Sequence, residues 1–122
     1  MTLIGLQLIF LPSCNIFYTA KTACTIKNNT SNSVIINGLS GYVDISESVI
    51  ILPGSQFQFN SESTSIGETL SLKVSINGIN YQANTRYIQD YKSVSLTLYG
   101  TNSYILSDPD GNMIETKDLV PF

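Results

Sequence analysis

Apolar and polar side chains alternate strictly in the middle of the chain, on both sides of an Asn-Gly pair. From residue 70 to 76 every second residue is Leu, Val or Ile, and a similar alternation runs from 79 to 84. Successive side chains of a strand point to opposite faces of a sheet, so a period of two predicts half-buried strands. Asn77-Gly78 can adopt positive φ at both central positions of a type I′ turn. The sequence therefore predicts a β-hairpin over residues 70–84.

Shorter alternating runs occupy the rest of the chain from residue 23. Val94, Leu96 and Leu98 alternate with Ser and Thr, while Phe57 and Phe59 alternate with Gln and Asn. Turn residues recur about every 8–12 residues, and no long helical period follows the N-terminus. We therefore expect an all-β fold: an antiparallel β-sandwich (immunoglobulin-like or similar) of about seven to ten short strands.

The turn residues also predict how neighbouring strands are connected. Residues 23–27 and 33–37 are expected to form a hairpin across the polar stretch 28–32. A turn at residues 38–41 is expected to precede a weak strand at 42–45.

Charge is scarce and histidine is absent, which excludes several classes of function. The 122 residues include 6 Lys or Arg and 9 Asp or Glu, for a net charge of −3. Because six cationic side chains are too few to neutralise a phosphate backbone, no nucleic acid partner is expected. Without His there is no Ser-His or Cys-His pair and no His-containing zinc site. We expect no enzymatic activity, no metal and no cofactor.

The first fourteen residues differ in composition from the rest. Residues 1–11 are mostly apolar and carry no charged side chain, and this span is too short to cross a bilayer as a helix. It suits the apolar core of a secretory signal peptide. Leu11-Pro12-Ser13-Cys14 resembles the lipobox of bacterial, Gram-negative-type lipoproteins, although no Lys or Arg precedes the apolar run. An ordinary buried N-terminal segment is the alternative reading of these residues.

The resemblance implies a domain layout and a location. The signal peptide, residues 1–13, is cleaved; Cys14 carries the lipid, residues 14–21 form the lipidated Cys and tether, and 22–122 form the β-sandwich domain. The protein then belongs to the bacterial cell envelope, lipid-anchored, with the outer membrane favoured because Asn15 is not the Asp of inner-membrane lipoproteins. Cys24 is expected to be a buried thiol in the first strand. The alternative is a Cys14–Cys24 disulfide, which requires that Cys14 carries no lipid.

Residues 84–92 form an irregular segment that is a candidate binding loop. It holds Arg86, which is the only Arg of the chain, together with Tyr87, Asp90 and Tyr91. Tyr and Arg supply large contact areas with few rotatable bonds or a fixed set of donors, and are enriched in binding sites. The alternative is a structural connection whose tyrosines cap the core while Arg86 and Asp90 pair at the surface. Residues 61–67 form a second candidate contact loop.

Asp108-Pro109-Asp110-Gly111-Asn112, followed by Glu115, resembles half of a calcium loop. An EF-hand places its glutamate at position 12, whereas Glu115 falls at position 8. Asp-Pro-Asp-Gly is also a good turn sequence, and we expect a turn here rather than a metal site.

Together these features predict an envelope-tethered, non-catalytic lipoprotein that is a small binding module for a protein or a glycan. Two alternatives stay open. The domain could be a structural or assembly subunit that pairs through sheet edges, because its strands carry few charges. It could also be an uncleaved cytosolic or viral β-sandwich protein.

Overall fold

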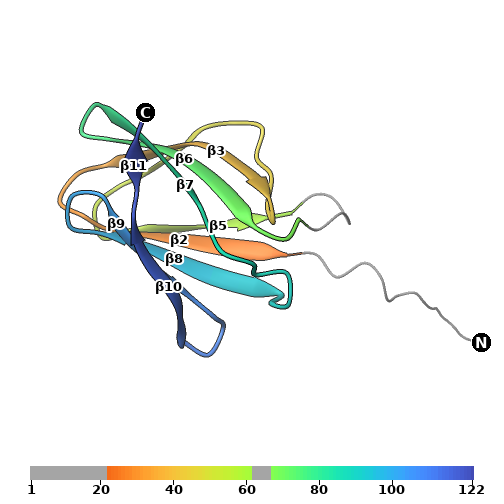
Figure 1. Cartoon of the computed structure of the whole chain (residues 1–122). Coiled ribbons are helices and arrows are strands. Elements are labelled where there is room, and N and C mark those ends of the chain that lie inside the picture. Colours follow the sequence, from red (N-terminus) through yellow and green to blue (C-terminus); the bar gives the residue numbers. More distant parts are fainter. Residues whose placement is uncertain (1–21, 62–66) are drawn as a thin grey trace, which may run out of the picture.

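A computed structural model describes residues 22–61 and 67–122, and strands dominate both segments (Figure 1). The strands are β2 (Ala23–Asn29), β3 (Val34–Gly41), β4 (Val49–Ile51), β5 (Gln56–Asn60), β6 (Leu70–Ile76), β7 (Ile79–Asn84), β8 (Ser93–Tyr99), β9 (Ser103–Ser107), β10 (Met113–Asp118) and β11 (Val120–Pro121). They form two five-stranded sheets, in the orders β10-β9-β8-β2-β5 and β11-β7-β6-β3-β4. The predicted all-β sandwich is confirmed. The predicted segments 1–13 and 14–21, with Cys14, lie outside the described residues.

The hairpin β6–β7 forms where the sequence predicts it. Asn77 and Gly78 both have positive φ, at 52° and 80°, as a type I′ turn requires. The apolar side chains of β6 point into the core, and each is at most 3% exposed. Local turn chemistry and burial agree here.

The predicted hairpin of residues 23–27 and 33–37 is wrong, because the two strands lie in different sheets. β2 pairs with β5 and β8, whereas β3 pairs with β4 and β6. The cause is Asn28, whose buried side chain donates to the carbonyls of Asn32 at 2.7 Å and Ile51 at 2.9 Å. Its carboxamide oxygen accepts from the backbone N–H and the hydroxyl of Thr30. These bonds hold a turn that carries the chain from one sheet to the other.

The predicted turn at 38–41 and strand at 42–45 are also wrong. β3 continues to Gly41, with a register irregularity between Ile36 and Gly38 that absorbs one extra residue. Tyr42 and Val43 then leave the sheet and are buried in the connection, since their side chains fill the core. Gly41 has φ 92°, which only glycine adopts easily at this bend.

The pairing of β2 with β8 is parallel, although every other strand pair is antiparallel. This pair joins strands about seventy residues apart in the chain at the centre of one sheet. Parallel pairing needs a long crossover. Here the connection runs through β3 and β4 of the second sheet, back through β5, and then through β6 and β7 of the second sheet.

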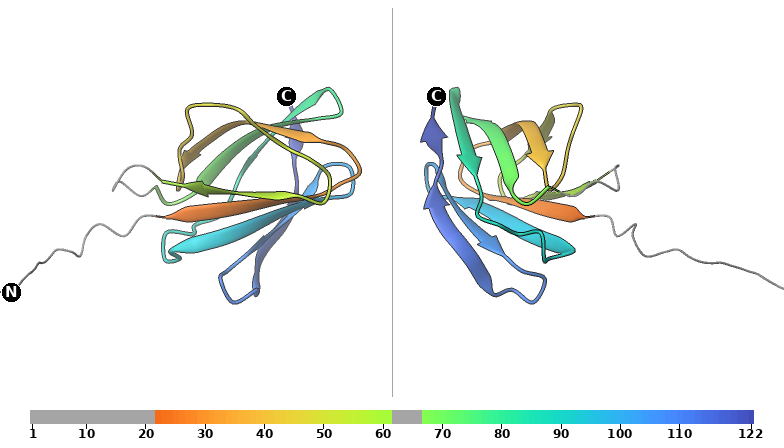
Figure 2. Two further views of the ribbon diagram at one scale, coloured as in Figure 1. Left: turned by 180° about the vertical axis from the view of Figure 1, so that it is seen from behind. Right: turned by 45° about the vertical axis from the view of Figure 1, so that its right-hand side comes forward.

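The chain passes from one sheet to the other on both sides of the sandwich. On one side β4 leads to β5 through residues 52–55, and on the other β10 leads to β11 through Leu119 (Figure 2). Leu119 is 1% exposed, and its carbonyl accepts from the Asn102 side chain at 3.0 Å. The edges of the two sheets are therefore β5 and β4 on one side, and β10 and β11 on the other.

Candidate functional site

The connection from β7 to β8, residues 85–92, is irregular but firmly attached to the core. Ile88 is fully buried, and its N–H donates to the carbonyl of Glu68 at 2.8 Å. The buried Thr85 hydroxyl accepts from the N–H of Leu70 at 2.9 Å. Loops held in this way can present side chains on a rigid scaffold. Sequence reasoning missed Ile88 as the anchor, although it is the apolar residue at the middle of a polar segment.

The turn from β9 to β10 is fixed by Asp108. Its Oδ1 accepts from the N–H of Asp110 at 2.9 Å and from the N–H of Asn112 at 2.8 Å. Gly111 has φ 87°, which completes the turn. The predicted turn is confirmed, and the Asp108 carboxylate is engaged with its own backbone.

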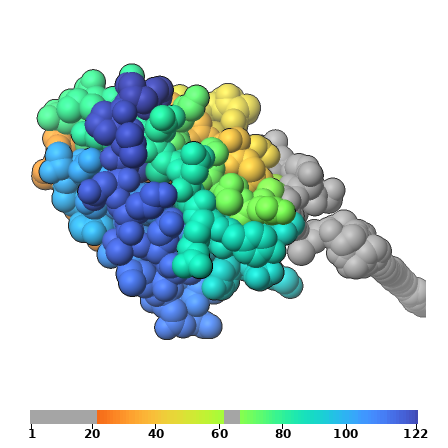
Figure 3. Space-filling model, viewed as in Figure 1, coloured from red at the N-terminus to blue at the C-terminus, as the bar shows by residue number. Residues whose placement is uncertain are grey.

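These two segments meet at one open depression, which we call the Tyr87 depression. It encloses about 450 Å³ and is lined by Arg86, Tyr87, Asp90, Tyr91, Asp108, Asn112, Met113 and Ile114. Figure 3 shows residues near 90 (blue-green) directly beside residues near 110 (blue). All four sequence-predicted binding residues therefore share one site. Its second wall was not predicted, because no local pattern indicates that the two segments meet.

The two tyrosines of the loop have different surroundings. Tyr87 is 48% exposed, and its hydroxyl shares its one proton between Gln89 Oε1 at 3.1 Å and Asp90 Oδ1 at 3.5 Å. Lost solvation, and next the nearby Asp90 carboxylate, raise the pKa of Tyr87, so the phenol stays protonated. Tyr91 is half-buried and packs against the core, and its carbonyl accepts from the Tyr42 hydroxyl. Tyr87 therefore offers an aromatic face to solvent, whereas Tyr91 is largely structural.

Arg86 is attached through its backbone and exposes its side chain. Its N–H donates to Glu115 Oε1 at 3.3 Å, and the buried Tyr104 hydroxyl donates to the same oxygen at 2.9 Å. Burial, followed by the Glu115 carboxylate, raises the pKa of Tyr104. Over the described ranges no ion pair joins Arg86 to Asp90. The predicted alternative of a surface pair between these side chains is therefore wrong, because the Asp90 carboxylate turns toward the Tyr87 hydroxyl.

The other sequence candidates do not add to this site. Cys24 is a free, fully buried thiol in β2, as predicted, and burial raises its pKa from about 9 to about 12. Such a thiol is a poor nucleophile at neutral pH. Of the second predicted contact loop, residues 62–66 lie outside the described part of the chain.

Residues 22–61 and 67–122 contain no group of three or more His, Cys, Asp or Glu side chains placed to hold a metal ion. The same residues include no helix that is long and apolar enough to cross a membrane.

No protein-family model and no curated protein matches the chain.

Proposed function

We propose that the protein is a non-catalytic binding module that holds a glycan in the Tyr87 depression. The observation that carries this proposal is the meeting of two firmly held segments around an exposed aromatic ring, an unpaired guanidinium among the described residues, and polar oxygens. Neither segment is a site by itself.

The chemistry of the lining favours a hydroxyl-rich ligand. The C–H face of a sugar ring is large and weakly polar, and the exposed ring of Tyr87 can stack on it. Asp90 and Asn112 offer acceptors and donors to sugar hydroxyls, and the Arg86 guanidinium offers a fork of donors. A volume of about 450 Å³ lies in the range of small-ligand sites. A protein partner is the other outcome that the experiment below distinguishes.

We propose further that the module is attached to the bacterial outer membrane through a lipid on Cys14. Support comes from the apolar residues 1–11 and the Leu11-Pro12-Ser13-Cys14 lipobox. A diacylglyceryl group on the thiol plus an acyl chain on the amine would anchor the chain stably, because one acyl chain gives only marginal attachment. The intact mass of the native protein tests this: 13.4 kDa means an uncleaved chain, and a shortened, acylated species is expected.

A glycan array followed by calorimetry tests the binding proposal. We expect binding by the wild type, and at least about tenfold weaker binding by Tyr87→Ala and by Asp90→Asn, the scale of one lost aromatic or charged contact. Tyr99→Ala is the matched control, because Tyr99 is an exposed tyrosine outside the depression. If no glycan binds, or if Tyr99→Ala weakens binding equally, the proposal is wrong. Binding of a purified protein through Tyr87 would replace the glycan by a protein ligand.

A further inference from the structure

The edge strand β5 lacks the features that usually protect a sheet edge. Its sequence, Gln-Phe-Gln-Phe-Asn, contains no charge and no proline, and its pairing with β2 is regular over all five residues. Seen from behind in Figure 2, β5 borders the sandwich with no strand on its outer side. An uncharged, regular edge is a template for another strand.

The register of β5 shows which backbone groups are free to pair. Ser61 donates its N–H to Thr22, and Asn28 donates its N–H to Ser55, both at 2.9 Å. Hydrogen-bonded pairs alternate along an antiparallel ladder, so odd-numbered residues of β5 bond to β2. The N–H and C=O groups of Gln56, Gln58 and Asn60 therefore point outward, away from β2.

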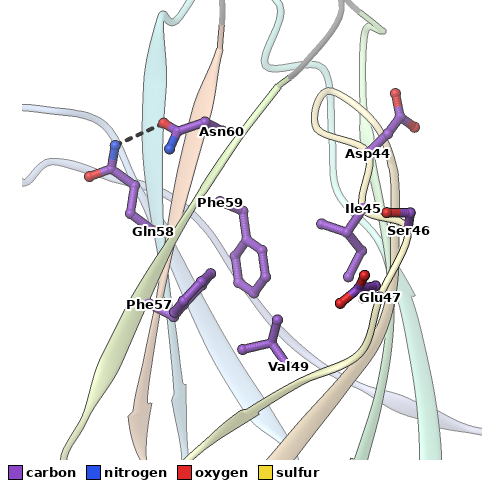
Figure 4. Close-up of a pocket in the computed structure, with 9 residues that line it drawn as sticks. All are labelled: Asp44, Ile45, Ser46, Glu47, Val49, Phe57, Gln58, Phe59 and Asn60. Carbon is purple, nitrogen blue, oxygen red and sulfur yellow. Dashed lines mark hydrogen bonds between the residues drawn. The ribbon is translucent and has the colours of Figure 1, made fainter.

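The inner face of this edge is apolar and partly uncovered. Phe57 and Phe59 lie with ring centroids 4.7 Å apart, but Phe59 is 3% exposed whereas Phe57 is 45% exposed. Figure 4 shows both rings pointing toward Ile45 and Val49 across a groove of about 370 Å³, which we call the Phe57 groove. The connection between β3 and β4 forms the far wall, and no neighbouring strand of the described chain covers Phe57.

We propose that β5 pairs antiparallel with β5 of a second copy of this chain, about a twofold axis that passes midway between the two Gln58 residues. This register places Gln58 opposite Gln58 of the second copy, and Gln56 opposite Asn60. It also places Phe57 of each copy opposite Phe59 of the other, on the inner face. The β5-containing sheets of the two copies then join into one continuous sheet.

A second copy suits this edge because the strand is complementary to itself. All three outward-facing residues carry backbone donors and acceptors, and on the outer face amide side chains meet only amide side chains. The exposed ring of Phe57 gains a phenyl neighbour, which is a favourable cross-strand pair. The interface is short, so the dimer is weak and depends on concentration. Each copy carries a net charge of −3, so added salt strengthens the dimer by screening the repulsion.

Sedimentation velocity of the full chain tests the proposal, in a mild detergent because residues 1–11 are mostly apolar. We expect the mass to rise from monomer to dimer as concentration increases from about 10 μM to about 1 mM, the range of weak association. Gln58→Lys places like charges opposite each other at the axis, and we expect about fivefold weaker association from one such pair. Ser95→Lys is the control, since it adds the same charge to the same sheet face on the interior strand β8.

A second variant tests the register itself. In Gln56→Glu with Asn60→Lys, each Glu faces a Lys of the other copy, so we expect tighter association at unchanged net charge. Within one copy, residue 56 pairs with Lys27, which also favours Glu there. A monomer at every concentration overturns the proposal. So does a dimer that Gln58→Lys leaves intact, or one that Ser95→Lys weakens equally. Glycan binding at the Tyr87 depression is a separate measurement that none of these variants is expected to change.

Discussion

The two sides of the sandwich differ in how their sheet edges meet the solvent. On one side β10 carries Glu115, Lys117 and Asp118 and a register irregularity, while β11 has two residues and includes Pro121. Charges, irregularities and proline all discourage strand addition. On the other side β4 and β5 carry none of these. The same fold therefore presents one edge that rejects strands and one that can accept them.

The two sides also close the core by different means. At the β10–β11 crossing a single apolar residue, Leu119, lies between the sheets. At the β4–β5 crossing the buried Asn28 side chain bonds to the carbonyl of Ile51, and the Phe57 groove stays open beyond it. The comparison shows that a buried amide can hold a crossing while leaving apolar surface uncovered beside it.

The largest loss of stability is expected when an apolar side chain is truncated: Leu119 at the β10–β11 side, compared with Phe57 at the β4–β5 side. We expect Leu119→Ala to lower the free energy of unfolding by about 3 kcal/mol, as for other fully buried leucines. Phe57→Ala should cost only about 1 kcal/mol although the ring is larger, because much of its surface is already in water. Urea unfolding at low micromolar protein concentration, below the range in which the proposed dimer forms, measures both. Equal losses would contradict the difference between the two sides.

Losses of similar size are expected from the two asparagines at the crossings. Asn28→Ala should cost about 3 kcal/mol, because it removes four hydrogen bonds and leaves buried groups without partners. Asn102→Ala removes one side-chain bond at a part-buried site and should cost about 1 kcal/mol. The same unfolding experiment compares them. A larger loss for Asn102→Ala would show that the amide is not what holds the β4–β5 crossing.

A smaller effect is expected from Cys24, which lies on β2 directly opposite Phe59. Its pKa is about 12 in the fold and about 9 when exposed, so the folded state holds the proton more tightly. That contribution is complete below pH 9 and is lost as the pH rises toward 12. Between pH 8 and pH 10, wild type should lose about 1 kcal/mol more stability than Cys24→Ala.

Alkylation of Cys24 gives a control for the same comparison. The Phe57 groove is lined by β5, and Cys24 lies behind it on β2. If the groove does not extend past β5, an alkylating reagent does not reach the Cys24 thiol at pH 8 under native conditions. Rapid reaction there would mean that the open side admits solvent to the core.

The smallest effect on stability is expected at the Tyr87 depression. Tyr87→Ala and Arg86→Ala should each change the free energy of unfolding by less than about 0.5 kcal/mol, as is usual for exposed side chains. Thermal unfolding of the same variants measures this change in stability, and the glycan-binding assay is run in parallel. A loss above about 2 kcal/mol would assign these residues to the scaffold instead of to ligand contact.

Much of the fold follows from local signals, whereas its connectivity does not. The alternation from residue 70 and the Asn77-Gly78 turn predict β6 and β7 because both burial and turn act over a few residues. Residues 28–32 resemble any polar turn, and nothing local separates a hairpin from a crossing between sheets. That choice depends on the bond from Asn28 to Ile51, which is 23 residues away.

The candidate site was predicted in part for the same reason. Arg86, Tyr87 and Asp90 stand out because charged residues are scarce in this chain and Arg86 is its only Arg, beside a tyrosine in a short irregular segment. Their neighbours Asp108 and Asn112 were identified only as a turn, since their contact with residues 86–91 is long-range. Likewise, alternation alone treats Phe57 and Phe59 as equivalent, and only the packing of the opposite sheet buries one and exposes the other.

One sedimentation-velocity series with a fluorescent glycan tests whether the Tyr87 depression and the β5 edge act separately. The boundary of the protein reports the dimer, and the labelled boundary reports the ligand. We expect Tyr87→Ala to release the glycan and keep the dimer, whereas Gln58→Lys weakens the dimer and keeps the glycan. If either substitution abolishes both glycan binding and the dimer, or if neither substitution changes either one, the two sites do not act separately.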